Sequence, residues 1–333
     1  MKSAMDMGEV FQQRVMRVAD APGKAILFGE HAVLYGAPAV AIAIDLRASF
    51  TAVKSETWIL NGDEFNPLEN PYLSSLISEF GDVESPLSLK IESEIPIAAG
   101  LGSSAALSVA SSLAISSNPV STEKIARAAH HAEALAQGGR ASPTDTSTSA
   151  LGGVVVVAPS VIDSLEHRWA IDLESPDGAN HWDVHSLQIP ENIAEIPLVI
   201  GYTGVPSSTK EMVEIVASRM TSDSFRSAMD DVSSLARSSI NLLKTGTASM
   251  IGDAMNQCHS LLREIGVSSL ELESLIDAVL PFSYGAKLTG AGGGGCILAL
   301  AKNPSACAKA IKEAGGVAFV TSIAQQGVQL KTN

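Results

Sequence analysis

The sequence predicts an α+β protein of two domains, an α/β domain over residues 1–193 and an α+β domain over residues 194–333. Three observations predict this class. The chain of 333 residues is longer than a single domain usually is. Apolar runs of strand length alternate with helical periods in the first half, whereas the second half combines helical periods with strands around a glycine run. Hydrophobic residues make up 46% and charged residues 17%, which is typical of a folded globular protein.

The elements of the first half follow from local composition. Strands are expected where branched or aliphatic residues gather at strand length, over residues 24–28, 39–44, 48–53, 87–91 and 154–157. Helices are expected over residues 71–80, 104–116 and 122–137. The third helix has apolar residues at three- and four-residue spacing, and Gly138 and Gly139 follow it as a natural stop.

The second half begins after a polar, irregular stretch. Residues 159–190 show little periodicity, which is typical of a connection or an exposed hairpin, and the domain boundary is expected near their end. Strands are then predicted over residues 196–201, 285–289, 296–301 and 317–321. Helices are predicted over residues 208–218, 225–243, 248–265, 270–279 and 306–313. Ser208 and Glu211 form a capping box at the start of the first of these helices.

Charge and cysteine content exclude several classes of function. The chain has 22 Lys and Arg residues against 36 Asp and Glu residues, and its net charge of -14 would repel nucleic acid and anionic lipid, so neither is expected as a partner. The three cysteines form no CxxC pair, which favours buried free thiols over disulfides or zinc ligands. The first twenty residues lack the apolar core of a secretion signal, so a cytoplasmic location is expected.

A glycine-serine turn, "PIAAGLGSSAALSVA", precedes the predicted helix at residue 104. Gly100 and Gly102 would let the backbone approach a ligand closely, and the free amides of the helix start would attract phosphate. Ser103 and Ser104 add hydroxyls that could reach a phosphate or Mg²⁺. Ordinary helix capping is the alternative. No lysine follows as in a P-loop, and Ala105 replaces the third glycine of a dinucleotide fingerprint, so a nicotinamide site is only weakly indicated.

Three further stretches carry polar groups next to apolar runs. Lys24 heads a predicted strand, and Glu30 and His31 form a polar turn after it, which favours a cleft over isolated surface positions. Asp145 is expected in a Ser/Thr-rich loop, where turn or cap formation is the alternative to catalysis. The glycine run at residues 292–295 lies between two strands, which favours close approach to a ligand over a flexible linker.

Four motifs together resemble those of the mevalonate kinases, in the GHMP kinase superfamily, and the short length resembles the archaeal members. They are "APGKAILFGEHAVLYG", "IPIAAGLGSSAA", "SPTDTSTSALGG" and "GAKLTGAGGGGC", and they span residues 21–296. The resemblance implies an amino-terminal part similar to the second domain of ribosomal protein S5 and a ferredoxin-like carboxyl-terminal part. One extra residue in "AQGGRASPTD", and Tyr202 where an acidic residue is common, depart from the family pattern.

The resemblance also implies ATP and mevalonate as substrates, Mg²⁺ as cofactor and a homodimer. It assigns Asp145 and Lys24 to catalysis, with Asp145 acting as a base or only positioning the hydroxyl, and it assigns Ser104 and Glu133 to Mg²⁺. The substrate side would comprise Lys24, Glu30, His31, Asp145, Gly292 and Gly293. The nucleotide would lie on Pro96, Ile97, Ala98, Ala99, Gly100, Leu101, Gly102, Ser103, Ser104, Ala105 and Ala106. The alternatives are another small-molecule kinase of the superfamily, acting on phosphomevalonate, a sugar or homoserine, and a nucleotide-binding sensor without turnover.

Overall fold

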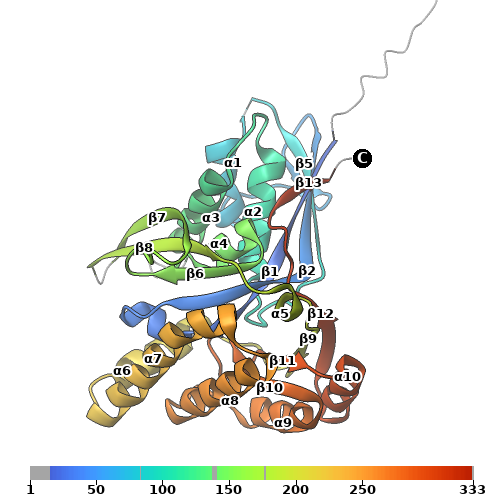
Figure 1. Cartoon of the computed structure of the whole chain (residues 1–333). Helices are drawn as coiled ribbons and strands as arrows, with labels where there is room; N and C mark the ends of the chain where they lie inside the picture. Colours follow the sequence, from blue (N-terminus) through green and yellow to red (C-terminus); the bar gives the residue numbers. More distant parts are fainter. Residues whose placement is uncertain (1–15, 83, 137–140, 176–177, 332–333) are drawn as a thin grey trace, which may run out of the picture.

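The computed structural model describes residues 16–82, 84–136, 141–175 and 178–331. Two β-sheets, each with its own helices, lie one above the other in Figure 1. The predicted stop at Gly138 and Gly139, and the extra residue next to them, lie outside the described residues. In the described part, no helix is both long and apolar enough to cross a membrane.

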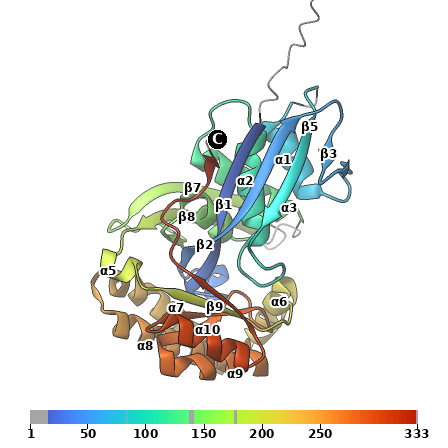
Figure 2. The ribbon, with the colours of Figure 1, turned by 90° about the vertical axis from the view of Figure 1, so that its right-hand side faces the viewer.

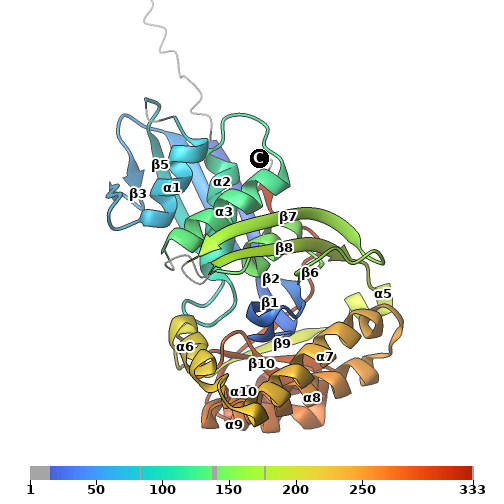
Figure 3. The same cartoon turned by 90° about the vertical axis from the view of Figure 1, so that its left-hand side faces the viewer.

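The first sheet is built around two long antiparallel strands, β1 and β2. Its order is β4-β3-β5-β2-β6-β8-β7, and β1 pairs with β2 and β13. The strands are β1 (Met16–Phe28), β2 (Ala39–Lys54), β3 (Ile59–Leu60), β4 (Asp63–Glu64), β5 (Leu87–Ser93), β6 (Val154–Ala158), β7 (Glu166–Ser175) and β8 (Gly178–Leu187). The stretch expected as a connection or hairpin contains the antiparallel pair β7 and β8, which Figure 3 shows in front of the helices.

Two of the strands expected in this sheet are a single strand. Residues 39–44 and 48–53 were expected as two strands, but they form the single strand β2. The pairing with β1 shifts between Pro22 and Gly23, which face Arg47 and Ile44 respectively, so Asp45 and Leu46 are accommodated as a bulge. A polar stretch that interrupts the apolar pattern therefore does not end the strand.

Helices cover one face of the first sheet, behind β1, β2 and β5 in Figure 2. They are α1 (Pro71–Phe80), α2 (Ser103–Ile115), α3 (Thr122–Ala136) and α4 (Thr144–Leu151). Helix α2 packs on β1 and β2 through small residues such as Ala106 and Ala110, which are fully buried. A 3-10 helix (Ala32–Tyr35) follows the turn at the end of β1.

The second sheet is antiparallel in the order β10-β11-β9-β12. Its strands are β9 (Leu198–Tyr202), β10 (Ser283–Thr289), β11 (Cys296–Ala301) and β12 (Val317–Thr321). The remaining helices are α5 (Glu191–Ala194), α6 (Thr209–Arg219), α7 (Asp223–Thr245), α8 (Ala248–Glu264), α9 (Leu270–Val279), the 3-10 turn Leu280–Phe282 and α10 (Pro304–Glu313). Ser208 caps α6 as predicted, because its side chain accepts a hydrogen bond from the amide of Glu211.

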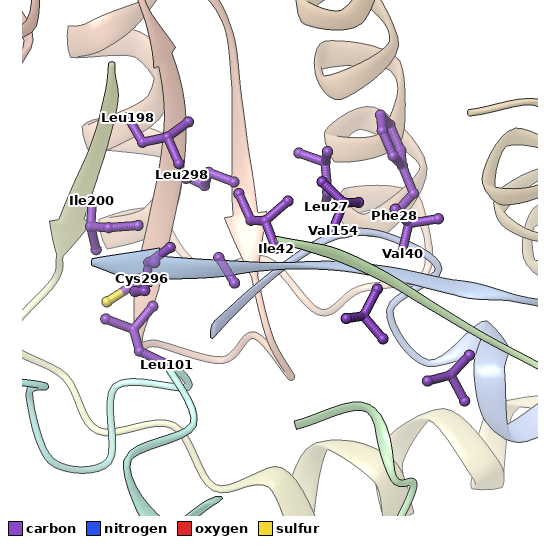
Figure 4. Close-up of a cluster of buried hydrophobic side chains, with 14 of the residues drawn as sticks. Leu27, Phe28, Val40, Ile42, Leu101, Val154, Leu198, Ile200, Cys296 and Leu298 are labelled. Carbon is purple, nitrogen blue, oxygen red and sulfur yellow. The ribbon is translucent and has the colours of Figure 1, made fainter. Parts of the chain in front are cut away.

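The two sheets share one hydrophobic core. Figure 4 shows Leu27 of β1 and Ile42 of β2 in the same buried cluster as Leu198 of β9 and Leu298 of β11. After β12 the chain returns to the first sheet, where the strand β13 (Gln329–Lys331) pairs with β1. The three cysteines are buried free thiols, as predicted.

Candidate active site

Lys24 and Asp145 meet although 120 positions separate them in the chain. The Lys24 Nζ atom lies 3.1 Å from Asp145 Oδ2. It also donates a hydrogen bond of 2.9 Å to the carbonyl of Gly100, and the Lys24 amide donates one of 2.9 Å to the carbonyl of Leu101. The Lys24 side chain is 4% exposed and that of Asp145 is 34% exposed. The Lys24 ammonium is therefore held by a backbone carbonyl, while the Asp145 carboxylate remains open to a ligand.

Asp145 does not lie in a loop, as its Ser/Thr-rich surroundings had suggested, but in the first turn of α4. Serine and threonine are weak helix formers because their side chains compete for backbone hydrogen bonds. Here most of α4 is buried against β1, β2 and α2, and the hydroxyl of Thr148 bonds back to the carbonyl of Thr144 within the helix. Packing thus overrides the local preference, and the helix dipole favours an acid at this position.

The turn before α2 has the backbone of an anion site. Left-handed φ angles occur at Ala98 (54°), Gly100 (78°) and Gly102 (72°), and backbone of this kind is typical of the turns whose amides bind anions. Gly102 precedes the first residue of α2, and no side chain of the described residues caps this helix start. A Cβ on Gly102 would lie 2.9 Å from Cγ of Lys24, so glycine is required where the lysine passes.

Ser104 and Glu133 form a pair of oxygen ligands beside this turn. The hydroxyl of Ser104, in the first turn of α2, donates a 2.8 Å hydrogen bond to Oε1 of Glu133 on α3. Burial raises the pKa of Glu133 to about 7, and the negative charge of Asp145 raises it too, against the smaller opposing effects of Ser104 and Lys24. A cation between Glu133 and Asp145 would relieve the repulsion between their negative charges.

This donor set suits a hard divalent cation only in part. Hydroxyl and carboxylate oxygens are the ligands that Mg²⁺ prefers, and Mg²⁺ commonly takes one or two protein carboxylates together with substrate phosphates. Within the described ranges, no three His, Cys, Asp or Glu side chains form a group that could hold a metal alone. Residues Ser104 and Glu133 therefore fit a metal that a bound nucleotide also ligates.

The loop between β10 and β11, residues 290–295, is called the glycine loop here, and the turn before α2, residues 96–102, the phosphate turn. The glycine loop of the second domain lies against the phosphate turn of the first. A Cβ on Gly290 would approach the carbonyl of Gly100 to 3.3 Å, and one on Gly295 would approach the carbonyl of Ala99 to 3.1 Å. Gly292 has a φ of 81°, and a Cβ there would lie only 2.0 Å from the carbonyl of Val267. Larger residues at positions 290 and 295 would crowd the turn, and one at position 292 would collide with Val267.

Ser207 is a residue that the sequence did not reveal. Its amide donates to the carbonyl of Ala98 at 3.0 Å, and its hydroxyl donates to the carbonyl of Gly292 at 2.6 Å. It therefore ties the phosphate turn to the glycine loop. The only signal was its place before the capping residue Ser208, which gave no reason to expect a contact with either loop.

The predicted substrate residues Glu30 and His31 lie at the interface of the two domains. Glu30 is 1% exposed, and its carboxylate pairs with the ammonium of Lys287 on β10. His31 Nε2 lies 2.9 Å from the carbonyl of Ala291, so this nitrogen carries the proton and donates. Burial lowers the pKa of His31, which favours the neutral ring. The structure thus brings His31 to the glycine loop and directs the Glu30 carboxylate to β10.

Family models match both halves of the chain. The model described as GHMP kinases N terminal domain matches residues 72–153, and the one described as GHMP kinases C terminal matches residues 239–316. A protein of Thermococcus sibiricus named mevalonate kinase is 34% identical over 360 aligned positions, which cover 95% of this chain and 99% of the relative. One of Methanothermobacter thermautotrophicus with the same name is 34% identical and covers 84% and 89%.

Solved structures share the fold. A crystal structure of mevalonate kinase has a TM-score of 0.72 at 25% identity and covers 93% of this chain and 99% of its own. The Methanococcus jannaschii mevalonate kinase gives a TM-score of 0.74 at 23% identity, with 94% and 99% covered. The L. major mevalonate kinase in complex with R-mevalonate gives 0.75 at 22% identity, with 92% and 96% covered. The two-domain fold predicted from the sequence is confirmed.

Proposed function

Because this chain belongs to the mevalonate kinase family of the GHMP kinases, we propose that it transfers the γ-phosphate of ATP to the C5 hydroxyl of (R)-mevalonate, giving 5-phosphomevalonate for isoprenoid biosynthesis. One observation carries the proposal. The ion pair of Lys24 and Asp145, at 3.1 Å, lies beside the carbonyl of Gly100 in an uncapped phosphate turn. An alcohol activated there would face a phosphate bound at the start of α2.

The reaction asks little covalent chemistry of the protein. A bond forms between the C5 oxygen and the γ-phosphorus, the bond from that phosphorus to the β–γ bridging oxygen breaks, and ADP leaves with the electron pair. Asp145 accepts the hydrogen bond of the hydroxyl and receives its proton as the new bond forms. Lys24 stabilises the negative charge that develops on the attacking and transferred oxygens.

The phosphate turn and the glycine loop hold the nucleotide in this proposal. Amides at the start of α2 would bind the β- and γ-phosphates, and the loop with Gly292 and Gly293 would close over them from the second domain. Ser104 and Glu133 would hold Mg²⁺, which supplies neutralisation of phosphate charge when it is bound. Their 2.8 Å contact and the burial of Glu133 support this assignment.

The Mg²⁺ requirement should depend on pH through Glu133. Its pKa is about 7, so below pH 7 a proton competes with the metal, and the apparent Mg²⁺ affinity should fall up to about tenfold per pH unit. Above pH 7 this dependence should disappear. The Glu133→Gln variant should bind Mg²⁺ weakly, and its Mg²⁺ affinity should lack this dependence on pH. The Ser104→Ala variant should need more Mg²⁺ but keep the same dependence on pH. Titrations of Mg²⁺ in the presence of ADP, at several pH values, measure both.

Glu133→Gln also provides the control, because ADP has a phosphate that titrates near pH 6 and contributes equally in both proteins. Only the difference between the parent and the variant reports on Glu133. If Mg²⁺ affinity depends on pH equally in the parent and in Glu133→Gln, Glu133 is not a ligand. A parental Mg²⁺ requirement in Ser104→Ala would exclude Ser104 in the same way.

A coupled assay of ADP release tests the substrate. It compares mevalonate with phosphomevalonate, galactose and homoserine at equal concentrations, with ATP and Mg²⁺ in excess. The proposal expects mevalonate to give the highest kcat/KM by at least about a hundredfold, since a site built for one set of hydroxyls rejects analogues that leave polar groups unpaired. A higher kcat/KM with another alcohol would contradict the proposal. ATP binding without ADP release would favour a sensor.

Two broader features belong to the same proposal. We infer a cytoplasmic location, which the buried free thiols at Cys258, Cys296 and Cys307 support because reducing compartments keep thiols free. The family resemblance also suggests a homodimer. Sedimentation equilibrium would measure the mass of the particle in solution, with 34.5 kDa expected for a single chain.

A further inference from the structure

Lys287 is a buried cation between the two domains that the proposed reaction does not use. Its side chain is fully buried on β10. Its Nζ atom pairs with the carboxylate of Glu30 and donates to the carbonyl of Leu288 at 2.6 Å, and the carbonyl of Ile26 lies at 3.5 Å. Two of these acceptors, Glu30 and Ile26, belong to the end of β1 and the turn after it. The ammonium of the second domain is thus inserted into the first.

The turn that Lys287 contacts has a backbone that needs support. Gly29 has a φ of 91°, and a Cβ there would lie 2.2 Å from the carbonyl of Pro38, so only glycine fits. His31 also has a left-handed φ, 61°, a conformation that is strained for a non-glycine residue. Such a conformation persists only where the surroundings fix it. Glu30 lies between these two residues and is fixed by Lys287.

Neighbouring residues also join the second domain to the end of β1 and the turn after it. Two residues after Lys287, the hydroxyl of Thr289 accepts a 2.8 Å hydrogen bond from the amide of Ile26 and lies 3.0 Å from its carbonyl. Further along, the carbonyl of Ala291 accepts the bond from His31. Strand β10 and the loop after it therefore hold the end of β1 at three places. Lys24 lies on β1 only two residues before Ile26, so this register also determines where its ammonium lies.

Stability alone is a poor explanation for this pair. Removing two charges from water is costly, and well-packed apolar residues often stabilise a protein as much as a buried ion pair or more. Apolar surroundings were available, because Cys258 and the core of the second sheet lie around the pair. Burial raises the pKa of Glu30, and the charge and hydrogen bond of Lys287 lower it in part. Lys287 neutralises the buried Glu30 carboxylate and ties it to β10.

We propose that Lys287 is a positioning residue for phosphoryl transfer: through Glu30 it fixes the Gly29–His31 turn and the end of β1, and hence Lys24, against the glycine loop. The kinetic test of this inference rests on the proposed function. A displacement of about 1 Å at a reacting group can lower turnover a hundredfold. The loss of Lys287 should therefore lower kcat even in a protein that folds normally.

The main test replaces both partners, Glu30→Met with Lys287→Met, so that no unpaired charge stays buried. The double variant should melt near the parent temperature, but its kcat with mevalonate should fall at least about tenfold. Its affinity for ADP should change less than about threefold, because the phosphate turn is untouched. The control removes another ion pair, between the buried Asp20 of β1 and the partly buried Arg47 of β2, as Asp20→Leu with Arg47→Met, and should keep the parent kcat.

A measurement without turnover separates this inference from the proposed function. The amides of Ala32 and Val33 donate to the backbone carbonyls of Glu30 and Gly29, respectively. Their hydrogen exchange should be faster in the double variant and unchanged in the Asp20/Arg47 control. If the parent chain fails to phosphorylate mevalonate, the proposed function fails, and this exchange still decides the role of Lys287.

The milder variant Glu30→Gln keeps an acceptor for Lys287 and guards against a double variant that does not fold. It should fold and show an intermediate loss of kcat, about threefold, because the neutral hydrogen bond is weaker than the ion pair. If the double variant folds and keeps the parent kcat and the parent exchange rates, the inference is overturned. If the double variant does not fold, the same two results in Glu30→Gln overturn it.

Discussion

Replacing Asp145 by asparagine should lower turnover by roughly a hundredfold or more, the scale of a lost acid-base group, while the protein folds and binds ATP. Asparagine keeps the shape of the side chain in the first turn of α4 but cannot take the proton of the hydroxyl. It also leaves Lys24 without its anionic partner at 3.1 Å. Steady-state kinetics with mevalonate measures kcat, and calorimetric titration measures nucleotide affinity.

The control for this variant is Asp223→Asn. Asp223 also lies in the first turn of a helix, α7, but it is exposed on the second domain, so the change in helix-dipole interaction is similar and the site is untouched. Its kcat should equal that of the parent. In Asp145→Asn the pKa of Glu133 should fall, because the charge of Asp145 raises it, and the Mg²⁺ requirement should stay low to a lower pH. A near-normal kcat would remove Asp145 from catalysis.

Replacing Lys24 by methionine should also lower kcat by roughly a hundredfold or more, since a preorganised charge at a developing anion contributes several kcal/mol in a dry site. Methionine fills much of the space that the lysine occupies over Gly102. It would leave the carbonyl of Gly100 without its 2.9 Å donor, so a modest loss of stability should accompany the kinetic loss. Thermal melting and kinetics separate the two effects.

Lys90→Met is the matched control, because Lys90 is 63% exposed and its ion pair with Glu92 lies on the surface of β5. Exposed ion pairs contribute little to stability, so melting temperature and kcat should both stay at the parent values. Combining Lys24→Met with Asp145→Asn should cost far less than the product of the single losses, because the two groups act as a unit. Multiplicative losses would show that they act independently.

The sequence predicted most elements of the fold because their patterns are local. The expected helices at Pro71–Phe80 and Leu270–Val279 and the strands at Cys296–Ala301 and Val317–Thr321 have the bounds found in the structure. The helices have a regular apolar period and the strands are short apolar runs, with glycine, proline or capping residues nearby. Lys24 and Asp145 were assigned together to catalysis, and the structure brings their side chains together.

What the sequence could not show depends on contacts between distant segments. Strand β1 starts at Met16 and not at Lys24, because the polar Asp20 is buried through ion pairs with Arg47 and Lys331. The same Arg47 lies within β2, where the pattern had suggested a break. The helix that carries Asp145 exists because the core surrounds it. Tertiary partners of this kind leave no periodic signal in the sequence.

Lys287 illustrates the same limit at the interface of the domains. A lysine in a short apolar strand is usually exposed at its end, and nothing nearby in the sequence suggests a partner. Its partner Glu30 lies 257 positions away, in the turn after β1. Only the packing of one sheet on the other reveals the pair.

Phosphorus NMR of the product made from ATP and (R)-mevalonate tests the central claim most directly. The account predicts one new phosphomonoester signal coupled to the protons on C5, formed in equal amount to ADP and missing in Asp145→Asn over the same time. A phosphate on the tertiary C3 hydroxyl, which would show no coupling to adjacent protons, or ADP formed only with inorganic phosphate, would contradict it.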